Sequence, residues 1–156
     1  MTDEDFMRLA IRKARAGVEK GQTPFGACIV KDGTVVVCEH NVVWRTTDIT
    51  AHAEIVAIRR ACAKLKTIEL SGCVMYSTCE PCPMCFSACH WARIGKIVYG
   101  ARIADARRAG FRELTIPSRT MRRLGKSAVS VTGGVLRNEC RGLFVRWAKQ
   151  PGRRAY

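Results

Sequence analysis

The chain has 156 residues, of which 47% are hydrophobic and 26% are charged, so it has the length of one ordinary domain and enough apolar material for a core. This composition excludes disordered and collagen-like proteins. The net charge is +14, and residues 102–156 hold 14 basic and 3 acidic side chains, which indicates either an anionic partner, with nucleic acid first, or a solubilising surface.

The first half of the chain predicts a helix, a β-hairpin, a loop and a second helix. Apolar residues recur at helical spacing in both helices, and two short β-rich runs flank the turn sequence Lys31-Asp32-Gly33-Thr34. In chain order we expect a helix over 5–19, strands over 27–30 and 35–39, a loop over 41–50 and a helix over 52–65.

The second half predicts alternating strands and helices, interrupted by an irregular Arg-rich stretch after residue 101. We expect strands over 73–78, 96–101 and 128–131, and helices over 81–93 and 136–147, the first of these opened by Pro81. This order predicts an α/β protein with one mixed sheet covered by helices. Residues 1–156 are expected to form a single domain, with a C-terminal helix and basic tail over about 136–156.

The sequence also predicts a cytoplasmic protein with reduced cysteines. The acidic start, Met1-Thr-Asp-Glu-Asp, lacks the basic and apolar segments of a signal peptide, and no apolar run approaches the ~18 residues of a membrane span. Nine cysteines is an odd number, and without a secretory signal we expect free thiols or metal ligands rather than disulfides.

Two motifs, each placed where a predicted helix begins, carry the residues suited to chemistry. They are Thr50-Ala-His52-Ala-Glu54 and Cys79-Glu-Pro81-Cys82-Pro-Met-Cys85. Cys82 and Cys85 share one helical face near the positive end of the helix, which favours thiolates. With His52 they form a three-ligand zinc site that leaves a fourth position for water, and Glu54 is placed to act as the base that this water needs.

Two other metal sites are compatible with parts of this pattern. A structural zinc finger requires four ligands with the pairs about a dozen residues apart, whereas His52 and Cys82 are 30 apart. An iron–sulfur cluster is the closer alternative, because its cysteine spacing matches Cys79, Cys82, Cys85 and Cys89. Against it, His90 stands where the cluster motif has proline, and Cys89 is also explained as a small core residue.

The two motifs together, H-x-E followed by P-C-x-x-C, resemble the signature of the zinc-dependent cytidine-deaminase superfamily. The resemblance implies a three-layer α/β/α sandwich with a five-stranded mixed sheet. It also implies that His52, Cys82 and Cys85 bind one zinc ion and that Glu54 transfers protons between water, ring and leaving amine.

Within the superfamily, the chain is most similar to bacterial guanine deaminases and next to bacterial tRNA adenosine deaminases. The similarity is carried by Pro24-Phe25-Gly26, by Asn41, by Trp91-Ala-Arg93 and by the segment from Asp105 to Gly110-Phe111-x-Glu113. It implies that Glu113 is a second catalytic acid. It further implies that the substrate is contacted by Phe25, Asn41, Ala53, Trp91 and Tyr156.

Each of these contacts has a plainer explanation. Phe25 and Trp91 fit a hydrophobic core equally well, and Asn41 fits a turn. Glu113 also fits an ion pair with Arg112 or Arg108. Tyr156 follows two arginines in a tail, although some guanine deaminases exchange this segment between subunits and use a terminal tyrosine as a lid.

Two stretches depart from the guanine-deaminase pattern. Asp48-Ile49 stands where most relatives have Asp-Pro, and the stretch from Val131 to Cys140 is more similar to the tRNA enzymes.

The sequence therefore predicts a zinc-dependent hydrolytic deaminase acting on the C–N bond of a cyclic amidine, with a guanine-like purine or triazine preferred. A tRNA adenosine deaminase that binds RNA through the Arg-rich C-terminal third is the alternative. A non-enzymatic iron–sulfur or nucleic-acid-binding protein is the third. The resemblance implies a homodimer, and no membrane partner is expected.

Overall fold

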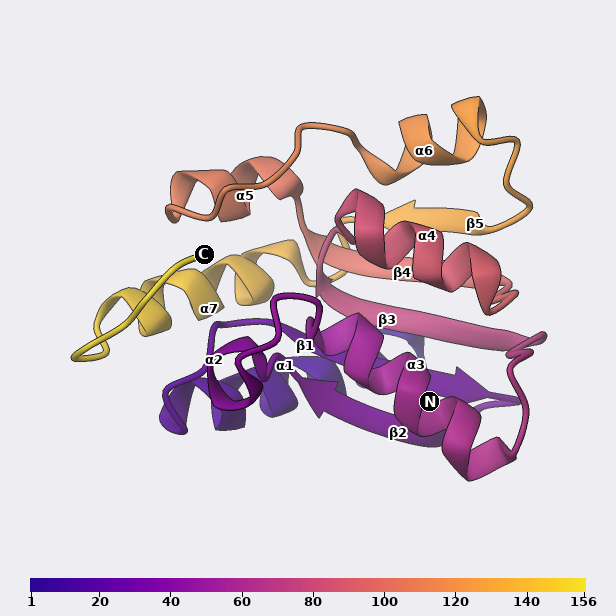
Figure 1. Cartoon of the computed structure of the whole chain (residues 1–156), viewed down its shortest axis with the longest axis horizontal. Coiled ribbons are helices and arrows are strands. Elements are labelled where there is room, and N and C mark those ends of the chain that lie inside the picture. The colour runs from indigo at the N-terminus through magenta and orange to yellow at the C-terminus, as the bar shows by residue number, and fades with distance from the viewer.

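The computed structural model describes residues 1–156 and contains a five-stranded mixed sheet with helices on both of its faces (Figure 1). The strand order across the sheet is β2-β1-β3-β4-β5. The strands are β1 (Gly26–Lys31), β2 (Thr34–His40), β3 (Cys73–Cys79), β4 (Lys96–Ala101) and β5 (Ser130–Gly133). β1 pairs antiparallel with β2 and β3, whereas β3, β4 and β5 are parallel. The expected sheet is confirmed.

The helices bury their apolar faces against the two sides of this sheet. α1 (Asp3–Glu19) packs on β1 and β2 and contacts α7 (Arg137–Ala148), which covers β4. α3 (Ala53–Leu65) and α4 (Pro83–Trp91) contact each other and lie in front of the sheet in Figure 1. The result is a three-layer sandwich with one main hydrophobic core. None of the helices combines the length and the apolar character that a membrane crossing requires.

Strand direction brings several chain segments to one edge of the sheet. β3 and β4 both end there, at Cys79 and Ala101, and the start of β1 and the end of β2 meet beside them because Gly26 pairs with His40. The cysteine motif follows β3, and the His52 motif follows the loop after β2, so both motifs lie at this edge. Open α/β sheets bind ligands outside the carboxyl ends of their strands, which makes this edge the expected place of the site.

Two glycines explain local geometry in the N-terminal hairpin. Asp32 and Gly33 both have positive φ, at 49° and 71°, as expected for the two-residue turn that joins β1 to β2. Gly26 lies so close to α1 that a Cβ atom there would overlap the backbone carbonyl of Ala10. The glycine of the Pro24-Phe25-Gly26 motif is therefore required for α1 to pack against β1.

Several predicted boundaries were wrong. The loop over 41–50 contains α2 (Val43–Thr46), and the irregular Arg-rich stretch contains α5 (Ile103–Arg108) and α6 (Ser118–Leu124). These helices have four to seven residues, which is too short for apolar periodicity to emerge.

Other elements are shifted by a few residues. The last strand is Ser130–Gly133 rather than 128–131, because Ser130 is the residue that pairs with Lys96 of β4. The helix after the cysteine motif begins at Pro83 rather than Pro81, with Cys82 as its N-cap residue.

One pair of cysteines departs from the expectation of free thiols. Cys28 and Cys38 face each other on the neighbouring strands β1 and β2 and form a disulfide. Cross-strand register, which sequence spacing alone does not reveal, brings them together. Seven cysteines remain as thiols, Cys82 and Cys85 among them.

Candidate active site

The three predicted metal ligands lie together at the edge of the sheet where β3 ends. The His52 Nδ1 atom is 3.7 Å from the Cys82 sulfur and 3.5 Å from the Cys85 sulfur. All three ligand atoms lie within 4.8 Å of one another. A tetrahedral zinc ion with Zn–S bonds of about 2.3 Å and Zn–N bonds of about 2.0 Å separates a sulfur from a nitrogen by about 3.5 Å. The geometry therefore fits one zinc ion.

This group of ligands excludes the iron–sulfur arrangement. Cys79 and Cys89 do not belong to the group, and the Cys79 thiol points instead to the backbone carbonyl of Arg102, 3.6 Å away. Cys89 is fully buried in the core, where burial raises the pKa of its thiol. Only two cysteines are available to a metal at this position, so a four-cysteine cluster does not form.

Two of the three predicted metal ligands lie at helix N-termini. His52 is the N-cap residue of α3 and Cys82 is the N-cap residue of α4, so both lie at the positive ends of helices that favour anionic groups. The hydrogen bond from Cys85 and the neighbouring His52 together lower the pKa of Cys82 to about 4, although burial opposes the shift. Cys82 is thus a thiolate at neutral pH, the form that binds metal.

Glu54 lies in the first turn of α3, two residues after His52, and is 6% exposed. One of its carboxylate oxygens accepts a hydrogen bond from the Ser77 hydroxyl, 3.1 Å away on β3. Burial raises the pKa of Glu54, and the charge of His52 opposes this shift. A carboxyl group whose pKa moves toward neutrality is suited to both accepting and donating a proton.

Glu113 reaches the same site from the irregular segment between α5 and α6. It lines a small cavity together with the metal ligands His52 and Cys82 and with Glu54. Burial raises the pKa of Glu113 to about 7, and the negative charge of Cys82 adds to this shift. Glu113 forms no ion pair, and Arg108 pairs instead with Asp105. The surface ion-pair explanation of Glu113 is therefore wrong.

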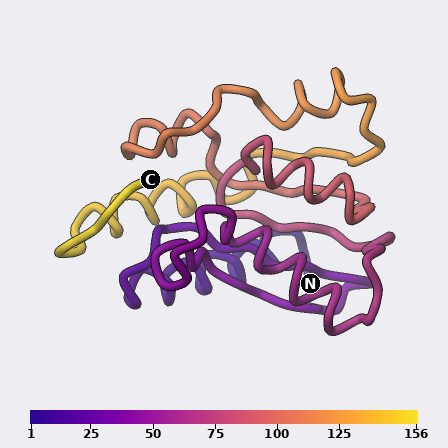
Figure 2. The backbone as a smooth tube through the Cα atoms, viewed as in Figure 1, coloured from indigo at the N-terminus to yellow at the C-terminus, as the bar shows by residue number.

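Tyr156 closes the site from the same chain. Its hydroxyl accepts a hydrogen bond of 2.6 Å from the Asn41 side-chain amide, and its ring centroid is 5.4 Å from that of His52. Its backbone carbonyl accepts a hydrogen bond from the Arg112 amide. Figure 2 shows the last residues running back from α7 to this position. Tyr156 is therefore held in the site and is not part of a floppy tail.

The space left beneath Tyr156 is small. The cavity that contains Glu54 and Glu113 has a volume of about 10 Å³. A cleft of about 330 Å³ lies beside it, and Tyr156, His52, Cys82 and Glu113 line both spaces. The two spaces therefore adjoin at Tyr156, and the metal ligands His52 and Cys82 border both of them.

Phe25, Asn41 and Ala53 also lie at or beside the site. The Phe25 ring lines the small cavity and packs edge-on against Phe111, with centroids 4.9 Å apart. The side-chain oxygen of Asn41 (Oδ1) accepts a hydrogen bond from the Val43 backbone amide, so this residue caps a turn, and its side-chain NH₂ group donates to the Tyr156 hydroxyl. Ala53 is buried directly after His52. Phe25 and Asn41 thus have structural contacts and also lie at the site, and their contacts with a substrate stay predictions.

Trp91 is the predicted contact that this chain does not bring to the site. It ends α4, its side chain is 81% exposed, and it lines a separate surface pocket with His90 and Ile94. The metal ligands lie at the opposite end of α4. The interpretation of Trp91 as a core residue is therefore wrong, whereas its contact with the substrate stays a prediction that this chain by itself does not bring about.

Sequence reasoning missed two contributors near the site. Trp44 lies on α2, 4.0 Å from the guanidinium of Arg154, and donates a hydrogen bond to the Arg154 carbonyl, which helps to hold the tail. Glu80 lines the small cavity and is 7% exposed. The sequence could have indicated Glu80 as a site residue, because it lies between Cys79 and Pro81 in the cysteine motif. For Trp44 the sequence offered none.

Comparison with known families gives one match that covers most of the chain. The sequence model described as "Cytidine and deoxycytidylate deaminase zinc-binding region" matches residues 1–101. Among curated proteins, a guanine deaminase of Bacillus subtilis is 46% identical over 112 residues, which are 71% of this chain and 72% of that protein. A tRNA-specific adenosine deaminase of the same organism is 36% identical over 142 residues, 91% of this chain and 86% of that protein.

Solved structures give the same pair of similarities. A guanine deaminase from Nitrosomonas europaea matches with a TM-score of 0.83 and 31% identity over 92% of this chain and 83% of that chain. A related protein solved with 8-azaguanine bound has a TM-score of 0.86 and 31% identity, covering 94% of this chain and 84% of that chain. A structure from a study of tRNA:A34 deaminases has a TM-score of 0.76 and 33% identity, covering 89% of this chain and 98% of that chain.

Proposed function

Because the chain belongs to the zinc-dependent cytidine and deoxycytidylate deaminase family, we propose that it deaminates a guanine-like free base, with Glu54 and Glu113 as its proton-transfer residues. The chain is a deaminase and thus a hydrolase of C–N bonds. In hydrolytic deamination, the oxygen of water bonds to the carbon that carries the amine, and the C–N bond breaks. One proton of the water goes to the ring nitrogen and the other leaves with ammonia.

Glu54 carries the proton transfers in this proposal. When bound at His52, Cys82 and Cys85, zinc supplies an activated water. Glu54 takes a proton from water and delivers it to the base, and the Ser77 hydroxyl holds its carboxyl group in place. Its raised pKa suits this double role, because a group must release the proton as readily as it accepts it.

The observation that carries the choice of substrate is Glu113, a partly buried acid that forms no ion pair and lines the cavity beside the metal ligands. A guanine-like base presents N–H donors beside its amine, and a carboxylate accepts such donors. With a pKa of about 7, Glu113 also exchanges a proton readily at neutral pH. Phe25 supplies an aromatic surface and Asn41 a side-chain amide for the base, and Tyr156 acts as a lid over it. The closed site supports a small ligand.

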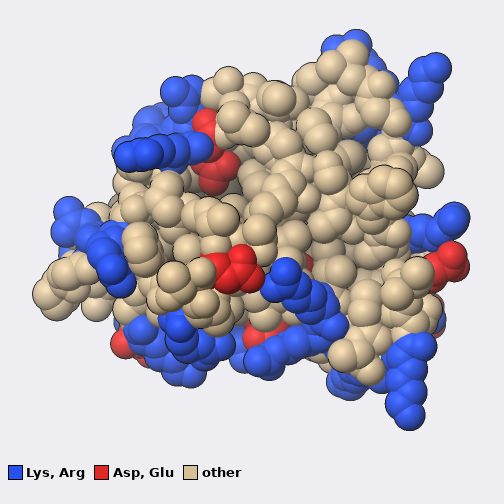
Figure 3. Space-filling view, viewed as in Figure 1, with Lys and Arg blue, Asp and Glu red and all other residues tan.

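An RNA substrate is the second candidate, and the basic C-terminal third favours it. Arg119, Arg122 and Arg123 on or next to α6 form no ion pair within the chain. On the face shown in Figure 3, Lys and Arg side chains lie mainly around the periphery, with a dense group over the α5 end. Several curated relatives are tRNA-specific adenosine deaminases.

An ammonia-release screen tests the proposal. The zinc-loaded protein is incubated with free bases, with nucleosides and with a tRNA anticodon stem-loop. We expect release from guanine or a guanine-like base, and Glu113→Gln should lower this turnover sharply because the amide cannot exchange the proton. Inosine formation in the stem-loop with no ammonia from any free base would overturn it.

Charge neutralisation distinguishes the two candidates independently. Replacing Arg119, Arg122 and Arg123 by Gln should leave turnover of a small base within about twofold. If RNA is the substrate, the same change weakens binding and flattens its salt dependence by roughly one unit of slope per lost phosphate contact.

A homodimer is also part of the proposal. Trp91 on α4 and Leu124 on α6 are large apolar side chains that are mostly exposed, and the two helices contact each other. Light scattering at micromolar concentration measures the mass directly, and the mass of a single chain would contradict this expectation.

A further inference from the structure

Glu80 is a buried carboxylate that the proposed chemistry does not use. It lies between the end of β3 and Cys82, is 7% exposed and has no Lys or Arg within ion-pair distance. Its two oxygens are both occupied, but by backbone amides. One accepts a hydrogen bond from the Ile103 amide at 3.3 Å, and the other accepts one from the Ser118 amide at 2.9 Å.

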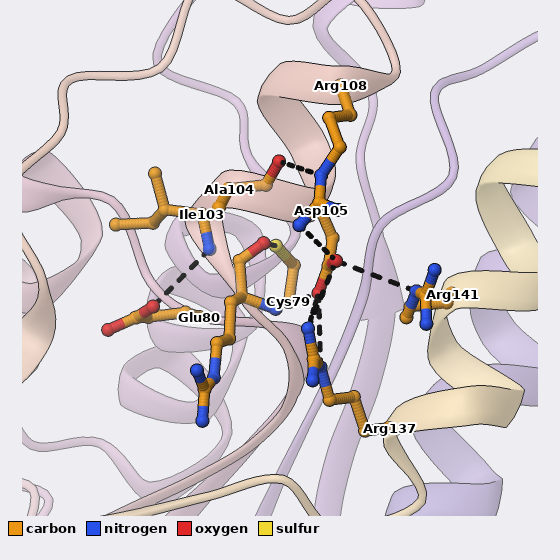
Figure 4. A network of polar contacts seen from close by, with 9 residues as sticks. Cys79, Glu80, Ile103, Ala104, Asp105, Arg108, Arg137 and Arg141 are labelled. Atoms are coloured by element: carbon orange, nitrogen blue, oxygen red, sulfur yellow. Dashed lines mark hydrogen bonds and ion pairs between the residues drawn. The ribbon is translucent and has the colours of Figure 1, made fainter.

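Those two amides are the ends of one segment. Ile103 begins α5 and Ser118 begins α6. The 14 residues from 104 to 117, which include most of α5, therefore lie between two backbone amides that are bound by the same side chain. Two more contacts join the same ends of the segment to residues 79–81. The Ser118 hydroxyl donates to the Pro81 carbonyl, and the Cys79 thiol points to the Arg102 carbonyl. Figure 4 shows Cys79, Glu80 and Ile103 at this junction.

The segment carries Glu113. Between its two ends the chain forms α5, turns at Gly110, whose φ is +103°, and places Phe111 in the core before Glu113 reaches the site. Asp105 attaches the beginning of the segment to α7 through Arg137 and Arg141 (Figure 4). At the other end, the Ser118 backbone amide has only the Glu80 carboxylate as partner, and the Ser118 hydroxyl adds the bond to the Pro81 carbonyl.

We propose that Glu80 is a positioning residue that holds the 103–118 segment, and with it Glu113, at a fixed place relative to the metal ligand Cys82. The inference rests on the proposed role of Glu113 in the reaction. Glu80 and Cys82 are two residues apart, so one short piece of backbone carries both a metal ligand and the attachment point of the second acid. A displacement of one is thereby transmitted to the other.

Glu80→Gln is the direct test, because glutamine has nearly the same size but only one side-chain oxygen. Its NH₂ group would face one of the two amide donors, so one end of the segment is released. We expect kcat/KM to fall about ten- to a hundredfold, mainly through kcat, with zinc content unchanged. Asp3→Asn is the matched control, because Asp3 also accepts two hydrogen bonds, from Tyr76 and Lys96, far from the site.

A double-mutant cycle separates positioning from general destabilisation. If Glu80 acts through Glu113, the variant that combines Glu80→Gln with Glu113→Gln should be no slower than Glu113→Gln alone. Asp3→Asn should instead combine with Glu113→Gln independently. Losses from Glu80→Gln and Glu113→Gln that multiply would overturn the proposal, as would a loss of zinc in Glu80→Gln.

A second measurement does not depend on activity. In Glu80→Gln, hydrogen exchange of the Ser118 amide should accelerate at least tenfold, and trypsin should cut faster after Arg107, Arg108 and Arg112. Unchanged exchange and cleavage would overturn the proposal even if turnover falls. If the wild-type protein deaminates no base, the proposed function fails, whereas these two readouts still decide whether Glu80 holds the segment.

Discussion

The two parts of the chain on either side of residue 101 contribute to the site in different ways. Residues 1–101 supply the metal ligands and Glu54 from helix N-termini packed against the sheet. Residues 102–156 supply Glu113 from an irregular segment and Tyr156 from the tail, and both are held by hydrogen bonds rather than by a strand or a long helix. In the proposed function, the metal ligands and Glu54 therefore lie on helices packed against the sheet, whereas the residues proposed to select the substrate lie on segments that are freer to vary.

The largest effect is expected from breaking the metal site in the first part. Cys82→Ala should lower the zinc content from about one ion per chain to nearly none and abolish turnover, because two ligands do not retain the ion. Elemental analysis of the purified protein measures this. Cys89→Ala is the control, since Cys89 lies on the same helix outside the ligand group. Full zinc content in Cys82→Ala would contradict the assignment.

Removing the proton-transfer group without disturbing the metal should have the next largest effect. Glu54→Gln is expected to keep its zinc and to lose about 10²–10⁴-fold in kcat, because the amide neither accepts nor delivers a proton. Steady-state rates per bound zinc measure the loss. A near-normal rate in a zinc-replete variant would show that another group carries the protons.

The tail should have a smaller effect, and its sign distinguishes the two substrate classes. Tyr156→Phe removes the hydroxyl that accepts the Asn41 hydrogen bond, and a bond of this kind contributes about 0.5–1.5 kcal/mol. If Tyr156 is a lid over a small base, KM should rise about two- to tenfold. If it obstructs a larger substrate, KM should fall. Tyr76→Phe, whose hydroxyl bonds Asp3 away from the site, is the control and should leave KM unchanged.

The smallest effect concerns the free energy of unfolding. The pKa of Glu113 is about 7 in the folded protein, above its usual 4.5, so the folded state binds the proton more tightly. Its contribution to stability is therefore fully present below pH 4.5 and is lost as the pH rises toward 7. Glu113→Gln should be more stable than wild type at pH 8, by on the order of 1 kcal/mol after solvent screening, and equally stable at pH 4. Urea unfolding at both values checks this.

The opposite sign at pH 8 would have a clear meaning. A less stable Glu113→Gln would show that the charged carboxylate is stabilised by a partner, and the interpretation of Glu113 as a partly buried acid without an ion-pair partner would fail. Asp105→Asn offers the contrast, because Asp105 is paired with Arg137 and Arg141 and its loss should destabilise the protein at pH 8.

Most of the first part was predictable from the sequence, because its signals are local. Helical periodicity and turn residues located α1, α3 and the β1–β2 hairpin to within a few residues, and the spacing of His52, Cys82 and Cys85 reflects the ligand geometry of one ion. A metal site constrains which residues occupy a few positions, so residue type and spacing alone were enough to indicate it.

Only the tertiary structure decided the rest, because those features depend on which distant segments meet. Cross-strand register paired Cys28 with Cys38, and the path of the tail brought Tyr156 to Asn41 across 115 residues. The length and direction of α4 carried Trp91 away from the ligands that begin the same helix. Glu80 bonds backbone amides, which every residue except proline presents, so no residue type in the 103–118 segment could have revealed its partners.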